Sequence, residues 1–151
     1  MIKEIKKEER TEKWIQDLLK VWEDSVRASH RFLSEEEIEQ IKEYVPEALY
    51  GVSHLIVELD ESGELAGFMG TEENKLEMLF IKNSQRGKGI GKRLLRHGME
   101  NYGVNDLAVN EDNPQARGFY EHMGFQVYQR NAFDDQGNPY PVLYMQRMTK
   151  E

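Results

Sequence analysis

The chain has 151 residues, of which 38% are hydrophobic, a size and composition typical of one globular domain over residues 1–151. It contains no cysteine, which excludes disulfides, thiolate metal sites and a cysteine nucleophile. The net charge of −8 disfavours nucleic acid and favours a cationic partner. Apolar runs are only a few residues long, so we expect no membrane span and a cytoplasmic protein.

The first part of the chain predicts a short strand and two helices. Residues 2–5 alternate like a strand, and apolar residues then recur at helical spacing over residues 11–30. Ser34 and Glu37 form a capping box that begins a second helix, which Pro46 should interrupt or restart. The apolar stripes of both helices should face inward.

The rest of the chain predicts a sheet with two more helices. Turn-like segments separate three strands expected to form an antiparallel meander, at residues 53–59, 64–70 and 75–81. A glycine-rich loop then begins a helix that ends near Tyr102, and a helix beginning at Asn113 follows later. The remaining strands are expected at residues 106–110, 125–130 and 140–148. The predicted fold class is α+β, with a central mixed sheet of about seven strands flanked by four helices.

The glycine-rich loop, residues 85–92, is the most informative stretch of the chain. Glycines let several backbone N–H groups approach one anion, and the helix that begins there adds the positive end of its dipole. The spacing fits neither a P-loop nor the dinucleotide fingerprint. The loop therefore predicts a phosphate-binding site, and the cations around it are Arg86, Lys88, Lys92 and Arg93.

The run from Arg86 to Gly91 resembles the Arg/Gln-x-x-Gly-x-Gly/Ala signature of the GNAT superfamily of N-acetyltransferases. Residues 113–125 are similar to that family's Asn-x-x-Ala-x-x-Phe-Tyr-x-x-x-Gly-Phe segment. Residues 22–33 and 134–141 resemble a narrower, YjaB-like bacterial branch. The resemblance covers essentially the whole chain and implies the GNAT fold.

The resemblance implies that acetyl-CoA is the cosubstrate. In the family, the loop holds the pyrophosphate, and backbone groups of the preceding strand bind the pantetheine arm and the acetyl carbonyl. Tyr120 would protonate the departing thiolate, since a phenol with a pKa near 10 is a suitable donor. The residues expected to contact the cosubstrate are Leu79, Phe80, Ile81, Arg86, Gly87, Lys88, Gly89, Ile90, Gly91, Lys92, Asn110 and Asn113.

The group that accepts the amine proton has two candidates. By strand alternation, Glu77 should share a face with Leu79 and Ile81, and a glutamate on this strand activates a water in many related enzymes. His30 titrates near neutrality and should lie between the two N-terminal helices, where it would orient the acceptor or relay a proton. The sequence does not choose between them. The other histidines lack metal-ligand spacing, so no metal site is predicted: His54, His97 and His122.

The predicted function is direct transfer of an acetyl group from acetyl-CoA to a primary amine. The acceptor is expected to be cationic, either a protein lysine or a small amine, because acidic residues flank the expected acceptor side at 35–37 and 134–135. The competing function is a catalytically silent acyl-CoA sensor. A third possible function, a nucleotide-binding regulator, is supported by the glycine-rich loop alone. Monomer and homodimer both remain open.

Overall fold

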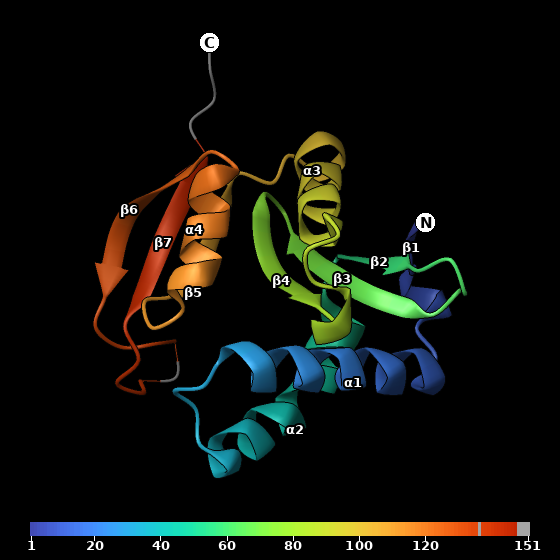
Figure 1. Ribbon diagram of the computed structural model, residues 1–151, viewed down its shortest axis with the longest axis horizontal. Helices are drawn as coiled ribbons and strands as arrows, with labels where there is room; N and C mark the ends of the chain where they lie inside the picture. The colour runs from blue at the N-terminus through green and yellow to red at the C-terminus, as the bar shows by residue number, and fades with distance from the viewer. Residues whose placement is uncertain (136, 148–151) are drawn as a thin grey trace.

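The computed structural model describes residues 1–135 and 137–147, which form a seven-stranded mixed sheet with helices on both faces (Figure 1). The elements follow the predicted order. They are β1 (Ile2–Glu4), α1 (Glu12–Ser29), α2 (Glu35–Gly51), β2 (His54–Leu59), β3 (Leu65–Glu72), β4 (Lys75–Ile81), α3 (Ile90–Tyr102), β5 (Asp106–Asn110), α4 (Pro114–His122), β6 (Phe125–Asn131) and β7 (Val142–Arg147), with short 3₁₀ turns η1 (Lys7–Glu9) and η2 (Asn83–Gln85).

The sheet has the order β1-β2-β3-β4-β5-β7-β6. Strands β2, β3 and β4 form the predicted antiparallel meander, whereas β4 and β5 are parallel. β4 and β5 pair only through Lys75 with Asp106 and Leu76 with Leu107. Among the described residues, the second half of β4, residues 78–81, therefore has no partner strand on its β5 side, and Figure 1 shows the two strands diverging there.

Two hydrophobic cores lie on opposite faces of the sheet. Successive side chains of a strand point to opposite faces, so Phe68 of β3 packs with α1 and α2 whereas Met69 packs with α3 and α4. Figure 1 shows these helix pairs as separate layers. No helix in the described residues is both long and apolar enough to span a membrane.

The structure corrects several predicted boundaries. Helix α2 runs through Pro46 without interruption, because Val45 and Leu49 on either side of the proline are both buried against the core. β3 extends past its predicted end to Glu72, and the turn that follows places Glu73 at a positive φ of 53°. β7 begins at Val142 instead of residue 140, and its predicted end at Met148 lies outside the described residues.

Candidate active site

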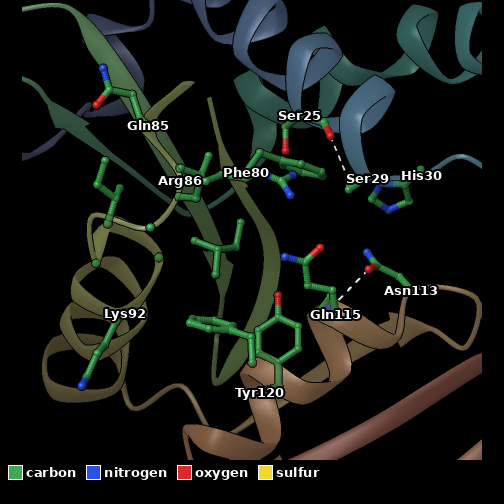
Figure 2. Close-up of a pocket in the computed structure, with 18 residues that line it drawn as sticks. Ser25, Ser29, His30, Phe80, Gln85, Arg86, Lys92, Asn113, Gln115 and Tyr120 are labelled. Atoms are coloured by element: carbon green, nitrogen blue, oxygen red, sulfur yellow. Dashed lines mark hydrogen bonds between the residues drawn. The ribbon is translucent and has the colours of Figure 1, made fainter. Parts of the chain in front are cut away.

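A cavity of about 370 Å³ lies where the second half of β4, the loop before α3, the start of α4 and the end of α1 meet. Figure 2 shows side chains from these segments around it. The separation of β4 from β5 allows segments distant in the sequence to share one space. The predicted site residues that line the cavity are His30, Leu79, Phe80, Ile81, Arg86, Gly87, Gly89, Ile90, Gly91, Lys92, Asn113 and Tyr120.

The loop before α3 presents free backbone donors at one end of this cavity. Gly87 and Gly89 adopt φ angles of 79° and 80°, which glycine tolerates without strain. Gly89 is the N-cap of α3 and has no side chain to cap it. Within the described chain, the N–H groups of residues 89–92 donate to no protein acceptor. Such a helix start attracts an anion, and these donors fit the diphosphate of acetyl-CoA.

The edge of β4 provides the second feature that fits this cosubstrate. Leu79, Phe80 and Ile81 pair with β3 on one side, but β5 does not pair with them on the other. Backbone groups on that side are available to a ligand lying along the strand. The free N–H groups of the loop can therefore hold the diphosphate, and the strand edge can hold the pantetheine arm attached to it.

Tyr120 contributes an unpaired hydroxyl to the cavity. Its helix begins at Asn113, whose side chain accepts a hydrogen bond of 3.2 Å from the N–H of Ala116. The Tyr120 ring packs against Phe119 and Phe125, at centroid distances of 5.3 and 6.2 Å. No described group hydrogen-bonds the hydroxyl, which points into the cavity in Figure 2. Burial raises the pKa of Tyr120 well above 10, so the phenol is protonated at neutral pH.

His30 caps the C-terminus of α1, and its tautomer follows from two neighbouring contacts. The Ser29 hydroxyl lies 2.8 Å from the carbonyl oxygen of Ser25 and 2.8 Å from Nδ1 of His30. The carbonyl can only accept, so the single hydroxyl proton points to Ser25. Nδ1 must then donate to Ser29, which leaves Nε2 as a proton acceptor. Burial and the charge of Arg86 lower the pKa of His30, so the ring is neutral at pH 7.

Glu77 does not lie in this cavity. The pairing of β3 with β4 shifts between Gly70–Met78 and Thr71–Leu76, so Glu77 is the extra residue of a β-bulge. The bulge breaks the alternation that predicted a face shared with Leu79 and Ile81. Glu77 instead lines a surface hollow beside the end of α2, with Lys75 Nζ 4.0 Å from its carboxylate. The role of Glu77 as a proton acceptor stays a prediction, and the cavity does not include its side chain.

Three other expected residues also lie outside the cavity lining. The ammonium group of Lys88 donates a 3.1 Å hydrogen bond to the side-chain oxygen of Gln85, and Lys88 lines a different hollow. Arg93, expected among the cations of the loop, forms an ion pair with Glu58. Asn110 lines a neighbouring hollow, where its buried Oδ1 has no partner among the described residues. Lys92 does line the cavity, but Figure 2 shows its ammonium group extending away from it.

A second hollow of about 580 Å³ adjoins the first, and His30 and Phe80 line both. Its other walls come from α1, α2 and the segment between β6 and β7. Tyr140 of that segment donates a hydrogen bond to Glu37 at the start of α2 and packs against Phe32 at 5.6 Å. Opposite ends of the chain therefore enclose this hollow. Its ionisable carboxylates are Glu37, Glu43 and Asp134.

The sequence matches the model of the acetyltransferase (GNAT) domain family over residues 29–144. The chain belongs to the GNAT acetyltransferase family. It is 40% identical over 130 residues to the peptidyl-lysine N-acetyltransferase YjaB of Salmonella typhimurium, covering 83% of this chain and 86% of that protein. It is 38% identical over 132 residues to YjaB of Escherichia coli, covering 85% and 86%.

Solved structures agree with this assignment. The solution structure of apo YjaB from Escherichia coli superimposes with a TM-score of 0.85 at 33% identity, covering 99% of this chain and 98% of that one. PaiA N-acetyltransferase from Thermoplasma acidophilum, solved with coenzyme A, shares the fold with a TM-score of 0.69 at 22% identity, covering 97% and 99%. The predicted GNAT fold, YjaB-like branch and acetyl-CoA-dependent acetyltransferase activity are confirmed.

Several residues of this GNAT site were not predicted from the sequence. Gln115, Ala116 and Phe119 line the cavity beside Tyr120, and their spacing along α4 places them on one helical face. Ser25 and Ser29 precede His30 and likewise lie four residues apart on α1. Counting back by one helical turn from Tyr120 and from His30 would have predicted both sets. Gln85 completes the missed lining residues.

Proposed function

We propose that this GNAT enzyme acetylates the side-chain amine of lysine residues in proteins. The observation that supports this most directly is the junction of two hollows, because His30 and Phe80 line both the proposed cosubstrate cavity and its neighbour. An amine entering through the second hollow would reach the cosubstrate cavity beside the neutral imidazole of His30. The curated relatives at 40% and 38% identity are named as peptidyl-lysine N-acetyltransferases.

The second hollow has the chemistry of a lysine side chain. Trp22, Val26 and Ile41 provide apolar surface for the aliphatic stem. Glu37 and Glu43 provide negative charge that attracts an ammonium group during entry. A lysine in an exposed or flexible protein segment is therefore the acceptor we propose, in preference to a neutral amine.

In the proposed chemistry, this chain accepts one proton and donates another. Acetyl-CoA, when bound, supplies an acetyl group on a thioester. The lysine ammonium first loses one proton to solvent, which leaves the free amine. His30 then accepts a proton at Nε2 from the attacking amine, because the amine nitrogen becomes much more acidic as it bonds to the carbonyl carbon. Tyr120 donates its hydroxyl proton to the sulfur as the C–S bond breaks. The N–C bond replaces the C–S bond, so the products are an acetylated lysine and the free thiol.

The test is an acceptor screen with purified protein and acetyl-CoA, following free thiol and product mass. The informative pair is a lysine peptide blocked at its N-terminus and the same peptide with that lysine replaced by norleucine. We expect acetylation of the first peptide only. Turnover confined to polyamines or aminoglycosides would contradict the proposed acceptor. Coenzyme A binding without turnover on any amine would favour the sensor function.

Two finer expectations are part of this proposal. We place the enzyme in the cytoplasm, and cell fractionation tests this location. The state of assembly, monomer or homodimer, is measured by light scattering at several protein concentrations. Neither expectation affects the proposed chemistry.

A further inference from the structure

An ion pair lies behind the glycine-rich loop, outside the cavity lining. Glu58 of β2 has a side chain only 7% exposed, and both of its oxygens accept hydrogen bonds from Arg93 of α3. The two bonds measure 2.9 Å to Nε and 2.7 Å to Nη2. This bidentate geometry holds the guanidinium plane in one orientation.

The remaining nitrogen of the guanidinium group reaches the loop itself. Nη1 of Arg93 donates a 2.9 Å hydrogen bond to the carbonyl oxygen of Lys88. The same atom lies against Gly89, where a Cβ would come within 3.1 Å of it. Glu58, Arg93 and the Lys88–Gly89 peptide are thus connected in series.

Peptide geometry links this contact to the cavity. In a planar trans peptide, the carbonyl of one residue and the N–H of the next point in opposite directions. The structure has no cis peptide in its described residues. Because Arg93 holds the Lys88 carbonyl on one side, the N–H of Gly89 points to the other. Gly89 lines the cosubstrate cavity, and its N–H has no protein acceptor in the described chain.

We propose that Glu58 and Arg93 are positioning residues that orient the Gly89 N–H toward the diphosphate of acetyl-CoA. The inference rests on the proposed function, since it assumes that this cavity holds the cosubstrate. The tether has a physical purpose, because Gly89 follows this peptide with a φ of 80°, and glycine's conformational freedom there would allow the peptide to rotate. Rotation would turn the Lys88 carbonyl toward the phosphates, where two negative ends repel.

The charge-removing variant Glu58→Gln gives opposite results for the two possible roles of Arg93. If Arg93 only positions the loop, the variant loosens it and weakens coenzyme A binding, on the order of tenfold for one charge-assisted hydrogen bond. If Arg93 instead binds phosphate directly, the variant frees it and removes a nearby negative charge, so binding tightens. The sign of the change in Kd therefore separates positioning from direct contact.

The experiment measures binding of coenzyme A by calorimetry and of pantetheine, which lacks the diphosphate, by NMR titration. We expect Glu58→Gln to weaken coenzyme A binding and leave pantetheine binding unchanged. Glu61→Gln is the matched control, since Glu61 lies on the same hollow, is exposed and is not among the described hydrogen-bond or ion-pair partners of Arg93. It should leave coenzyme A binding unchanged or slightly tighter.

Unchanged or tighter coenzyme A binding by folded Glu58→Gln would overturn the inference. Equal loss of coenzyme A and pantetheine binding would also overturn it, because it would indicate general distortion. If Glu58→Gln does not fold, the paired variant Glu58→Leu with Arg93→Leu removes both charges and should show the same selective loss. Wild-type protein that bound no coenzyme A would instead contradict the proposed function itself.

Discussion

At the scale of single residues, the Tyr120 hydroxyl can be removed without disturbing its surroundings. Tyr120→Phe keeps the ring that packs against Phe119 and Phe125. We expect kcat to fall on the order of 10²-fold, as for loss of a general acid, with the Kd for acetyl-CoA unchanged. Thiol release and calorimetry measure the two quantities. A parallel loss of affinity would assign the hydroxyl to binding, and full activity would show that the thiolate leaves without it.

The His30 imidazole predicts a pH dependence. Burial and Arg86 lower its pKa below the ordinary 6.5, so the ring gains its proton only in more acidic solution. The kcat profile should therefore show an acidic limb below pH 6.5. His30→Gln should abolish that limb and lower kcat at pH 7 on the order of 10²-fold.

Glu77→Gln is the matched comparison, measured with the same lysine peptide. Because Glu77 lies in another hollow, we expect its replacement to change the profile little. The reverse pattern would make Glu77 the proton acceptor, acting from outside the described cavity. Unaltered profiles for both variants would leave solvent as the acceptor.

At the scale of elements, one hydrogen bond joins the start of α2 to the segment before β7. Tyr140 donates to Glu37, which also accepts from the N–H of Ser34 in the capping box. Tyr140→Phe should release that segment and raise the acceptor KM about 3- to 10-fold, the value of one ordinary hydrogen bond, with the acetyl-CoA KM unchanged. Steady-state kinetics with both substrates measure this. Tyr128→Phe on β6 is the control, because its hydroxyl donates to Asp106 of β5, outside this segment. Equal shifts in both variants would contradict the assignment.

At the scale of the whole molecule, Arg10 connects several elements. It is 5% exposed and donates hydrogen bonds to the backbone carbonyls of Ile5, Leu49 and Val52 at 3.0, 3.2 and 2.6 Å. These bonds join the end of β1, the end of α2 and the segment before β2. Arg10→Met leaves these buried carbonyls unpaired. We expect the free energy of unfolding to fall by about 3 kcal/mol.

Urea denaturation measures this loss. Arg96→Met, which removes an exposed charge from α3, should change the free energy of unfolding by less than about 0.5 kcal/mol. Arg10→Lys keeps the charge but loses the planar set of donors, so it should recover only part of the loss. An Arg10→Met protein as stable as the Arg96→Met control would show that water replaces the lost donors.

The sequence alone determined the order of the elements, the glycine-rich loop and the helix that holds Tyr120. These features depend on neighbours in the chain: periodicity, caps such as Ser34 and Asn113, and glycines where φ is positive. Only the tertiary structure decided the bulge that moves Glu77, the path of α2 through Pro46 and the pairing of Arg93 with Glu58. Each of these depends on strand register or on packing between distant segments, for which the local sequence has no signal.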